Sequence, residues 1–352
     1  MAIDFYDFFS SCGGTSCGMQ RAEMTVRFGL DVDPDAKLTW EANYKKAEFL
    51  CKDIRQVSVD DVAPYIKRRD RRPLFFGACA PCQPFSRQNR IRNDEDGIRG
   101  LLKEFHRFVS AYLPEYIFVE NVPGMQTVSS DIGPFANFIQ LLDDLNYFYD
   151  FKIVMACHYG VPQRRRRLVL IASQLGPIKI PQPTHGPGTT QPNLPTVWEW
   201  ISHLPSINAG ETHPEIANHR AARLSPLNLR RIAATPPGGS RRDWPEELKL
   251  SCHRRHSGYT DVYGRMIKSQ PSPALTTRCT SLSNGRFGHP EQNRAISVRE
   301  AACIQTFPME FTFHGSLNSM SRQVGNAVPV AMAKVFGDSI IRHYLSCRKS
   351  TL

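Results

Sequence analysis

Several features that would place a chain outside the globular proteins are missing from this sequence. No apolar run approaches the roughly 18 residues that span a bilayer, and the start, Met1–Phe9, lacks the basic segment of a signal peptide. The 352 residues include only 10 cysteines, which are too sparse for a disulfide scaffold. Hydrophobic residues at 41% and charged residues at 22% exclude a wholly disordered chain. We therefore expect a soluble, cytoplasmic protein whose cysteines are reduced thiols.

Positive charge is concentrated in one part of the chain. The net charge is +11, and residues 164–299 hold 20 basic and 8 acidic residues, so the rest of the chain is nearly neutral. A concentrated basic block is typical of a protein that binds a phosphate-rich partner such as nucleic acid. A solvated basic face is the alternative that charge alone leaves open.

The first 175 residues alternate between apolar runs typical of buried strands and segments with helical spacing. The predicted strands are Ile3–Phe9, Leu74–Cys79, Tyr116–Val119, Ile153–Ala156 and Leu168–Ala172, and the predicted helices are Cys17–Phe28, Leu101–Tyr112 and Phe135–Leu145. This alternation predicts an α/β fold, a mostly parallel sheet with helices on both faces. Fifteen of the 26 prolines lie between Pro177 and Pro290, which predicts a second, loop-rich domain. Helical patterns return at Ser297–Gln305 and Val328–Tyr344.

A glycine motif follows the first predicted strand. Asp7–Gly14 reads D-F-F-S-S-C-G-G, and its glycines permit a tight turn and close approach of a ligand to a helix N-terminus. Asp31 and Asp33 follow at about the distance at which a doubly wound fold places a carboxylate on a ribose. The motif alone fits a nucleoside site or a plain glycine turn.

A cysteine follows the predicted strand Leu74–Cys79 in a loop flanked by proline. Gly77–Ser86 reads G-A-C-A-P-C-Q-P-F-S, and Arg87, Arg90 and Arg92 come next. An exposed cysteine in such an electropositive loop is a candidate nucleophile. Cys79 and Cys82 also form a C-x-x-C, so a redox pair, or a zinc site completed by Cys252 and His256, is a second interpretation.

Three further motifs lie at predicted element ends. Tyr116–Gly124 reads Y-I-F-V-E-N-V-P-G, so Glu120 ends an apolar strand, where it is a paired structural acid or a proton donor with a raised pKa. Residues 163–167 read Q-R-R-R-R, and strand alternation sends Arg165 and Arg167 to one side and Arg164 and Arg166 to the other. Residues 323–329 read Q-V-G-N-A-V-P and open the last predicted helix.

The order of these motifs resembles that of the DNA (cytosine-5) methyltransferases of the bacterial type. The series runs from Asp7 to Pro329, and R-A-I-S-V-R-E-A-A-C-I-Q-T-F-P at 294–308 is similar to a late motif of the family. The resemblance implies a Rossmann-like catalytic domain that binds S-adenosylmethionine, residues 1–176 and 321–352. It also implies a smaller target-recognition domain, residues 177–320, which contains most of the basic, proline-rich block.

The resemblance also implies the chemistry of individual residues. Cys82 would add to carbon 6 of cytosine, Glu120 would protonate or hydrogen-bond ring nitrogen 3, and Arg165 would bind the carbonyl oxygen of the base. The implied S-adenosyl-L-methionine contacts are Phe9, Ser11, Gly13, Gly14, Asp31, Val32, Asp53, Ile54, Pro81, Leu102, Asn326 and Val328. The implied DNA contacts are Gln88, Arg167, Thr277 and Arg278. Because arginine can read guanine in the major groove, Arg241, Arg242, Arg278 and Arg286 are candidates for base recognition. Ser11 departs from the family, which usually has glycine there.

The implied partner is duplex DNA, with the target base flipped out of the helix. The resemblance also implies a companion restriction endonuclease of the same system. The protein itself is expected to be a monomer that associates with the nucleoid of a prokaryotic host and that uses neither a metal nor a membrane. A tRNA methyltransferase of the same family, an inactive DNA-binding relative and a redox or zinc protein are the alternatives.

Overall fold

The computed structural model describes residues 3–66, 72–80, 100–124, 133–251, 258 and 260–349. The chain forms two compact units. Unit 1 comprises Met1–Tyr159, Arg166–Pro183 and Val328–Leu352, and unit 2 comprises Gly160–Arg165 and Thr184–Ala327. These borders differ from those of the two functional domains expected from the sequence, and the functional division stays a prediction.

Unit 1 is built on a seven-stranded sheet with the order β3-β2-β1-β4-β5-β8-β6. The strands are β1 (Asp4–Phe8), β2 (Thr25–Asp31), β3 (Glu48–Cys51), β4 (Leu74–Ala78), β5 (Tyr116–Asn121), β6 (Phe148–Met155) and β8 (Arg166–Ser173). Among the first five strands, β1–β2, β2–β3, β1–β4 and β4–β5 pair in parallel, whereas β8 runs antiparallel to both β5 and β6. The predicted α/β fold with a mostly parallel sheet is confirmed.

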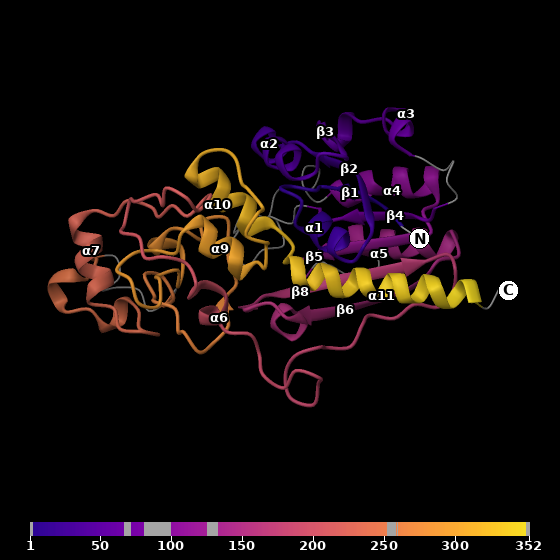
Figure 1. Ribbon diagram of the computed structural model, residues 1–352. Coiled ribbons are helices and arrows are strands. Elements are labelled where there is room, and N and C mark those ends of the chain that lie inside the picture. The colour runs from indigo at the N-terminus through magenta and orange to yellow at the C-terminus, as the bar shows by residue number, and fades with distance from the viewer. Residues whose placement is uncertain are drawn as a thin grey trace. The chain divides into compact units, whose positions relative to one another are not determined.

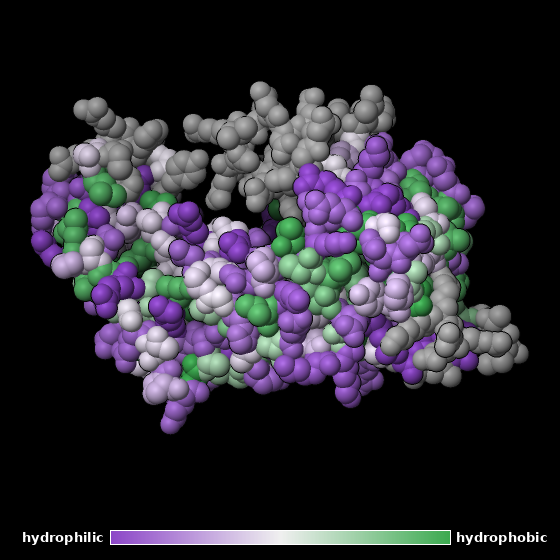
Figure 2. All heavy atoms as spheres, turned by 90° about the horizontal axis from the view of Figure 1, so that it is seen from above, coloured by the Kyte–Doolittle hydropathy of each residue, from purple (hydrophilic) through white to green (hydrophobic). Residues whose placement is uncertain are grey.

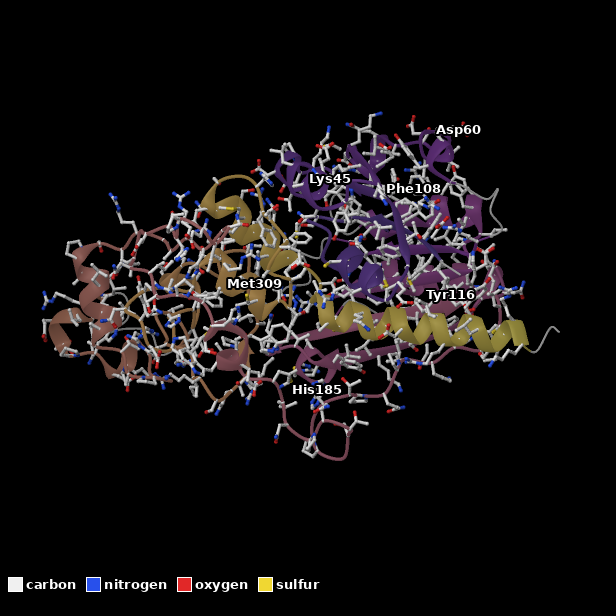
Figure 3. The ribbon with its side chains drawn as sticks, in the orientation of Figure 1. Lys45, Asp60, Phe108, Tyr116, His185 and Met309 are labelled. Atoms are coloured by element: carbon white, nitrogen blue, oxygen red, sulfur yellow. The ribbon has the colours of Figure 1, made fainter. Side chains whose placement is uncertain are left out.

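Helices cover both faces of this sheet (Figure 1). They are α1 (Gly14–Arg21), α2 (Pro34–Asn43), α3 (Val59–Val62), α4 (Leu101–Tyr112), α5 (Pro134–Asp144) and α11 (Val330–Lys349), with 3₁₀ turns η1 (Ile54–Gln56), η2 (Ala63–Tyr65) and η6 (Ala156–Tyr159). On one face, α4 and α5 bury an aromatic core against the strands. In that core the rings of Phe8 and Phe108 lie 5.1 Å apart, and Phe108 is labelled in Figure 3.

The opposite face of the sheet is covered by α1 and α11. These two helices approach closely, because a Cβ on Gly18 would overlap the Cβ of Ala333. Tyr116 of β5, labelled in Figure 3, shares a hydrogen bond of 2.9 Å with Nδ1 of His343 on α11. Residues 317–349, which include α11, are long and apolar enough to pass a composition test for a membrane span, but 61% of the tested window is buried, as is usual for a core helix.

Two sequence predictions in unit 1 are wrong in their bounds. The predicted helix Cys17–Phe28 is instead α1, which ends at Arg21, followed by β2 from Thr25. The predicted strand Ile153–Ala156 is the end of the longer β6, whose outer position leaves residues such as Phe148 exposed and weakens the apolar signal. Asp33 accepts a hydrogen bond from the backbone N–H of Asp35 and caps α2, which explains one of the two carboxylates after β2.

Unit 2 consists mainly of loops between short elements. Its strands are β7 (Gln163–Arg164) and β9 (Ser272–Pro273), its helices are α6 (Val197–Ile201), α7 (Pro226–Ala233), α9 (Val298–Ile304) and α10 (Leu317–Asn326), and its 3₁₀ turns are η7 (Arg241–Asp243), η8 (Glu246–Leu248) and η9 (Leu282–Asn284). Capping boxes begin α6 and α9 at Thr196 and Ser297. The loop-rich texture predicted from the prolines is confirmed.

Buried arginines hold the loops of unit 2 together. Arg265, 4% exposed, donates hydrogen bonds to the carbonyl oxygens of Ile232, Thr235, His289 and Gln292. Arg294 binds Glu300 through two hydrogen bonds of 2.7 and 2.6 Å. Part of the positive charge of this region is therefore structural, because these guanidinium groups replace the hydrogen bonds that loop carbonyls would otherwise make with water.

Candidate functional site

The glycine motif lies where the topology of the sheet changes direction. From β1 the chain continues to β2 and β3 on one side, and β4 and β5 lie on the other side of β1. Ligands of open α/β sheets bind beyond the carboxyl ends of the strands at such a switch point. Phe9, Ser11 and Gly13 follow β1 with φ values of 60°, 47° and 91°, so the loop turns sharply before α1 begins at Gly14.

Two side chains hold this loop from outside it. The backbone N–H of Ser11 donates to Oδ2 of Asp31 at 2.8 Å, while Oδ1 of Asp31 accepts from the backbone N–H of Asp33 at 3.0 Å. The hydroxyl of Tyr44 donates to the carbonyl oxygen of Gly13 at 2.5 Å. A Cβ on Gly13 would lie 2.5 Å from the Tyr44 ring, so only glycine fits. Sequence reasoning missed Tyr44, since no motif marks it.

Asp7 is a buried carboxyl at the start of the motif. Its side chain is 0% exposed, Oδ2 accepts a hydrogen bond of 2.6 Å from Oγ of Ser16, and Oδ1 has no hydrogen-bond partner among the described residues. Desolvation raises the pKa of Asp7 from 3.8 to about 7, although the bond from Ser16 lowers it. Burial also raises the pKa of Asp31. The charged forms of both carboxyls are thus disfavoured unless a donor or positive group approaches.

The other predicted cofactor residues differ in their accessibility. Val32 is 63% exposed next to Asp31, which leaves an apolar surface free beside the carboxyl. Asp53 receives the guanidinium of Arg55, with Nη2 2.5 Å from Oδ2, and this contact lowers the pKa of Asp53. Ile54 is 3% exposed, and Leu102, on α4, is 1% exposed within the core. The roles of Ile54 and Leu102 in cofactor binding stay predictions.

The remaining predicted cofactor residues divide between the units or lie outside the described chain. Phe9 is half-buried against the aromatic core of unit 1. Asn326 is exposed at the end of α10 in unit 2, whereas Val328 is 3% exposed in unit 1. Pro81 lies outside the described residues, as do the proposed nucleophile Cys82 and the predicted DNA contact Gln88.

An ion pair occupies the carboxyl end of β5. Glu120 is 7% exposed, and its Oε1 lies 2.7 Å from Nε of Arg167 on β8. The antiparallel register of β5 and β8, in which Glu120 is opposite Val169, brings the two side chains together. The predicted alternation is confirmed: Arg164 and Arg166 are exposed, Arg165 is buried and Arg167 is partly buried. The partner of Glu120 was nevertheless missed, because antiparallel pairing of these strands is not visible in the sequence.

Arg165 has its described contacts inside unit 2. Its side chain is 3% exposed, and its Nη1 donates to the carbonyl oxygens of Leu275 at 2.9 Å and Gly325 at 3.1 Å. These contacts join the segment before Thr276 to α10. Both hydrogen bonds use Nη1, and the expected contact of Arg165 with a substrate base stays a prediction.

The predicted DNA contacts separate into structural and exposed residues. Arg286 donates to the carbonyl oxygens of Gly238 and Gly239 at 2.5 and 2.7 Å. Arg241 is 7% exposed and donates to the carbonyl oxygen of Gly258. Two of the candidates are therefore tied to the fold of unit 2. Arg242, Thr277 and Arg278 are exposed, and their roles as DNA contacts stay predictions.

The metal and redox interpretations concern the cysteines. Among the residues that the structure describes, no group of three or more His, Cys, Asp or Glu side chains is arranged to hold a metal ion. Cys82, Cys252 and His256 lie outside those residues. Burial raises the pKa of Cys79 well above its ordinary value, and its Sγ lies 3.4 Å from the hydroxyl of Thr15. Cys79 is partly exposed, and a thiol with a raised pKa is mostly protonated at neutral pH, which makes it a weak nucleophile.

Comparison with known proteins covers nearly the whole chain. Residues 3–342 match the family model described as C-5 cytosine-specific DNA methylase. The chain is 41% identical over 343 residues to Type II methylase M.HgiDII of Herpetosiphon aurantiacus, covering 96% of this chain and 94% of that protein. It is 33% identical over 345 residues to Type II methyltransferase M1.HphI of Haemophilus parahaemolyticus, covering 97% and 87%.

A solved structure shows the same fold. It is a putative DNA modification methyltransferase encoded within an Escherichia coli prophage, with a TM-score of 0.74, 21% identity and coverage of 97% of this chain and 99% of that one. The DNMT2 structure of Spodoptera frugiperda is similar with a TM-score of 0.64, 16% identity and coverage of 97% and 100%.

Proposed function

The chain belongs to the C-5 cytosine-specific DNA methylase family, and from this premise we propose that it transfers a methyl group from S-adenosylmethionine to carbon 5 of cytosine in a specific duplex DNA sequence. The observation that carries the proposal is the Glu120–Arg167 ion pair at the carboxyl end of β5. It provides a carboxyl, oriented by a cation and shielded from water, at the edge of the sheet where the glycine loop also lies.

The glycine loop and Asp31 fit the methyl donor. The turn from Phe9 to Gly13 leaves backbone close to the ligand space, and the Asp31 carboxyl suits ribose hydroxyl donors. Exposed Val32 offers an apolar surface to a purine face. S-adenosylmethionine would supply an electrophilic methyl group. Asp53, which already binds Arg55, would need to accept a further donor to contact the adenine amino group.

The proposed chemistry relies on Cys82 as nucleophile. Its thiolate adds to carbon 6 of cytosine, while Glu120 gives a proton or hydrogen bond to ring nitrogen 3, so that carbon 5 becomes nucleophilic and takes the methyl group. A base, for which we propose water, then takes the proton from carbon 5; the double bond between carbons 5 and 6 re-forms and the thiolate leaves carbon 6. Arg167 orients Glu120 through the 2.7 Å contact, and we assign to Arg167, rather than to Arg165, the cation beside the reacting base.

Unit 1 carries this chemistry in the proposal, and unit 2 recognises DNA. The target base must leave the duplex, at a cost of a few kcal/mol, before a thiolate reaches carbon 6. Among the predicted DNA contacts, the exposed Arg242 and Arg278 are arginines suited to phosphate or base contacts. Because the relatives in the comparison are named Type II enzymes, we also propose a companion restriction endonuclease and a monomeric methyltransferase.

The proposal is tested by transfer of labelled methyl groups to duplex DNA and, in parallel, to tRNA. We expect label in DNA from the native chain and none from Cys82→Ser. We expect Glu120→Gln to slow transfer by about 10²- to 10⁴-fold, the usual contribution of a general acid. Asp338→Asn is the matched control, because it removes a carboxylate paired with Lys334 at 2.7 Å on α11. Label in tRNA alone, or full activity of Cys82→Ser, would overturn the proposal.

A further inference from the structure

One buried polar cluster joins two of the points at which the chain passes between the units. The chain leaves unit 2 after Arg165 and again after Ala327. We use the name crossing cluster for Gln163, Arg165, Leu275, Gln305 and Gly325, which are all in unit 2. Their hydrogen bonds connect segments that are more than 100 residues apart in the sequence.

The first part of the crossing cluster ties the Q-R-R-R-R motif to the segment before Thr276. Gln163 is 0% exposed, and its Oε1 accepts a hydrogen bond from the backbone N–H of Leu275 at 3.0 Å. Arg165 donates to the carbonyl oxygen of the same residue at 2.9 Å. β7 pairs with β9 immediately before this point, so the two segments are held by backbone and side-chain bonds together.

The second part of the crossing cluster ties this pair to the end of α10. Nε2 of Gln163 donates to Oε1 of Gln305 at 2.9 Å, and Nε2 of Gln305 donates to the carbonyl oxygens of Val324 and Ala327 at 2.7 and 3.1 Å. Gln305 is 0% exposed. Its bonds bracket Gly325, where a Cβ would overlap the carbonyl oxygen of Thr276. Backbone therefore packs directly on backbone at this position.

We propose that the crossing cluster positions the catalytic residues in response to DNA recognition, an inference that rests on the proposed function. Leu275 leads into the exposed residues Thr277 and Arg278, which are predicted to contact DNA. Arg167, which forms the ion pair with Glu120, is two residues after Arg165 in the chain. The hydrogen bonds that hold the segment with Leu275 therefore also hold the chain at both points where it leaves unit 2. The first of these points leads to Arg167, and the second follows Asn326.

Replacing one atom of Gln163 distinguishes a role in positioning the catalytic residues from a role in stabilising the fold alone. Gln163→Glu keeps the Oε1 acceptor for Leu275 but replaces the Nε2 donor with an oxygen that faces Oε1 of Gln305. The joint between the two parts of the cluster is therefore broken while the size of the side chain stays the same. A buried glutamic acid has a raised pKa, and its protonated form can donate, so acid conditions should restore the joint.

The experiment measures single-turnover methyl transfer and DNA affinity for the native chain, Gln163→Glu and Gln305→Met. Thr235→Val is the matched control, because it removes two buried hydrogen bonds, to Arg231 and from Trp244, elsewhere in unit 2. We expect both cluster variants to lose on the order of 10- to 100-fold in transfer rate, as small misplacements do, with DNA affinity within about threefold of the native value. The deficit of Gln163→Glu relative to the native chain should shrink at lower pH.

Three outcomes would overturn the positioning role. One is a rate loss no larger than that of Thr235→Val at equal loss of thermal stability. Another is a loss that appears only in DNA affinity. The third is a pH profile of Gln163→Glu that parallels the native profile. An inactive native chain would instead count against the proposed function, so the two failures are distinguishable.

Discussion

Replacing Asp7 by asparagine should remove a pH dependence from the stability of the fold. The carboxyl is 0% exposed, its Oδ1 lacks a hydrogen-bond partner among the described residues, and desolvation raises its pKa to about 7. Asparagine has nearly the same shape and its oxygen can still accept the 2.6 Å bond from Ser16. The variant therefore mimics the neutral carboxylic acid at every pH.

The expected magnitude follows from linkage. Between the ordinary pKa of 3.8 and the folded value of about 7, the native state binds a proton that the unfolded state has released. The stabilisation is present at low pH and is lost as pH rises towards about 7. At 1.36 kcal/mol per pH unit, the contribution of Asp7 falls by about 2.5 kcal/mol between pH 5 and pH 8.

Urea denaturation of the native chain and of Asp7→Asn at pH 5, 6, 7 and 8 measures this directly. Other groups titrate in both proteins, including His289, whose pKa burial lowers to about 4, and cancel in the difference. The difference in free energy of unfolding, Asp7→Asn minus native chain, should increase by about 2.5 kcal/mol from pH 5 to pH 8. Parallel pH curves for the two proteins would refute the buried, proton-binding carboxyl.

Three further changes test separate parts of the site. Arg167→Gln leaves Glu120 without its orienting cation, and we expect methyl transfer to fall by about 100-fold, more than DNA affinity falls; a change in affinity alone would contradict this. Ser11→Gly relieves a left-handed φ of 47° and keeps the N–H bond to Asp31, so urea denaturation should show a gain of about 1 kcal/mol, and a loss would show that Ser11 is not strained. Arg242→Ala should weaken DNA binding and reduce, by about one, the slope of the logarithm of the binding constant against the logarithm of the salt concentration. Arg286→Ala should mainly lower thermal stability, and equal effects of the two changes on DNA binding would refute the distinction between exposed and structural arginines.

Local patterns in the sequence predicted much of unit 1. The helix Leu101–Tyr112 has the expected bounds, because its apolar residues recur at helical spacing on a face that packs in the core. Asp7–Gly14 likewise ends a strand and opens a helix as expected. The predicted helix Cys17–Phe28 failed because the residues after Arg21 continue an apolar pattern that belongs to β2.

The sequence did not predict which distant strands pair or which groups individual charged side chains contact. The Glu120–Arg167 pair depends on the antiparallel register of β5 and β8, which no local pattern encodes. The net charge of unit 2 does not reveal that Arg286 and Arg265 bind loop carbonyls rather than solvent or a partner. On the face shown in Figure 2, hydrophobic residues are interspersed among hydrophilic ones.

Base-resolution methylation sequencing tests the central claim most directly. Unmethylated bacterial genomic DNA would be incubated with S-adenosylmethionine and either the native chain or Cys82→Ser. The proposed function predicts 5-methylcytosine in one short sequence context after incubation with the native chain and none after incubation with the variant. Absence of 5-methylcytosine with a folded native chain that binds the methyl donor, or equal methylation by Cys82→Ser, would contradict it.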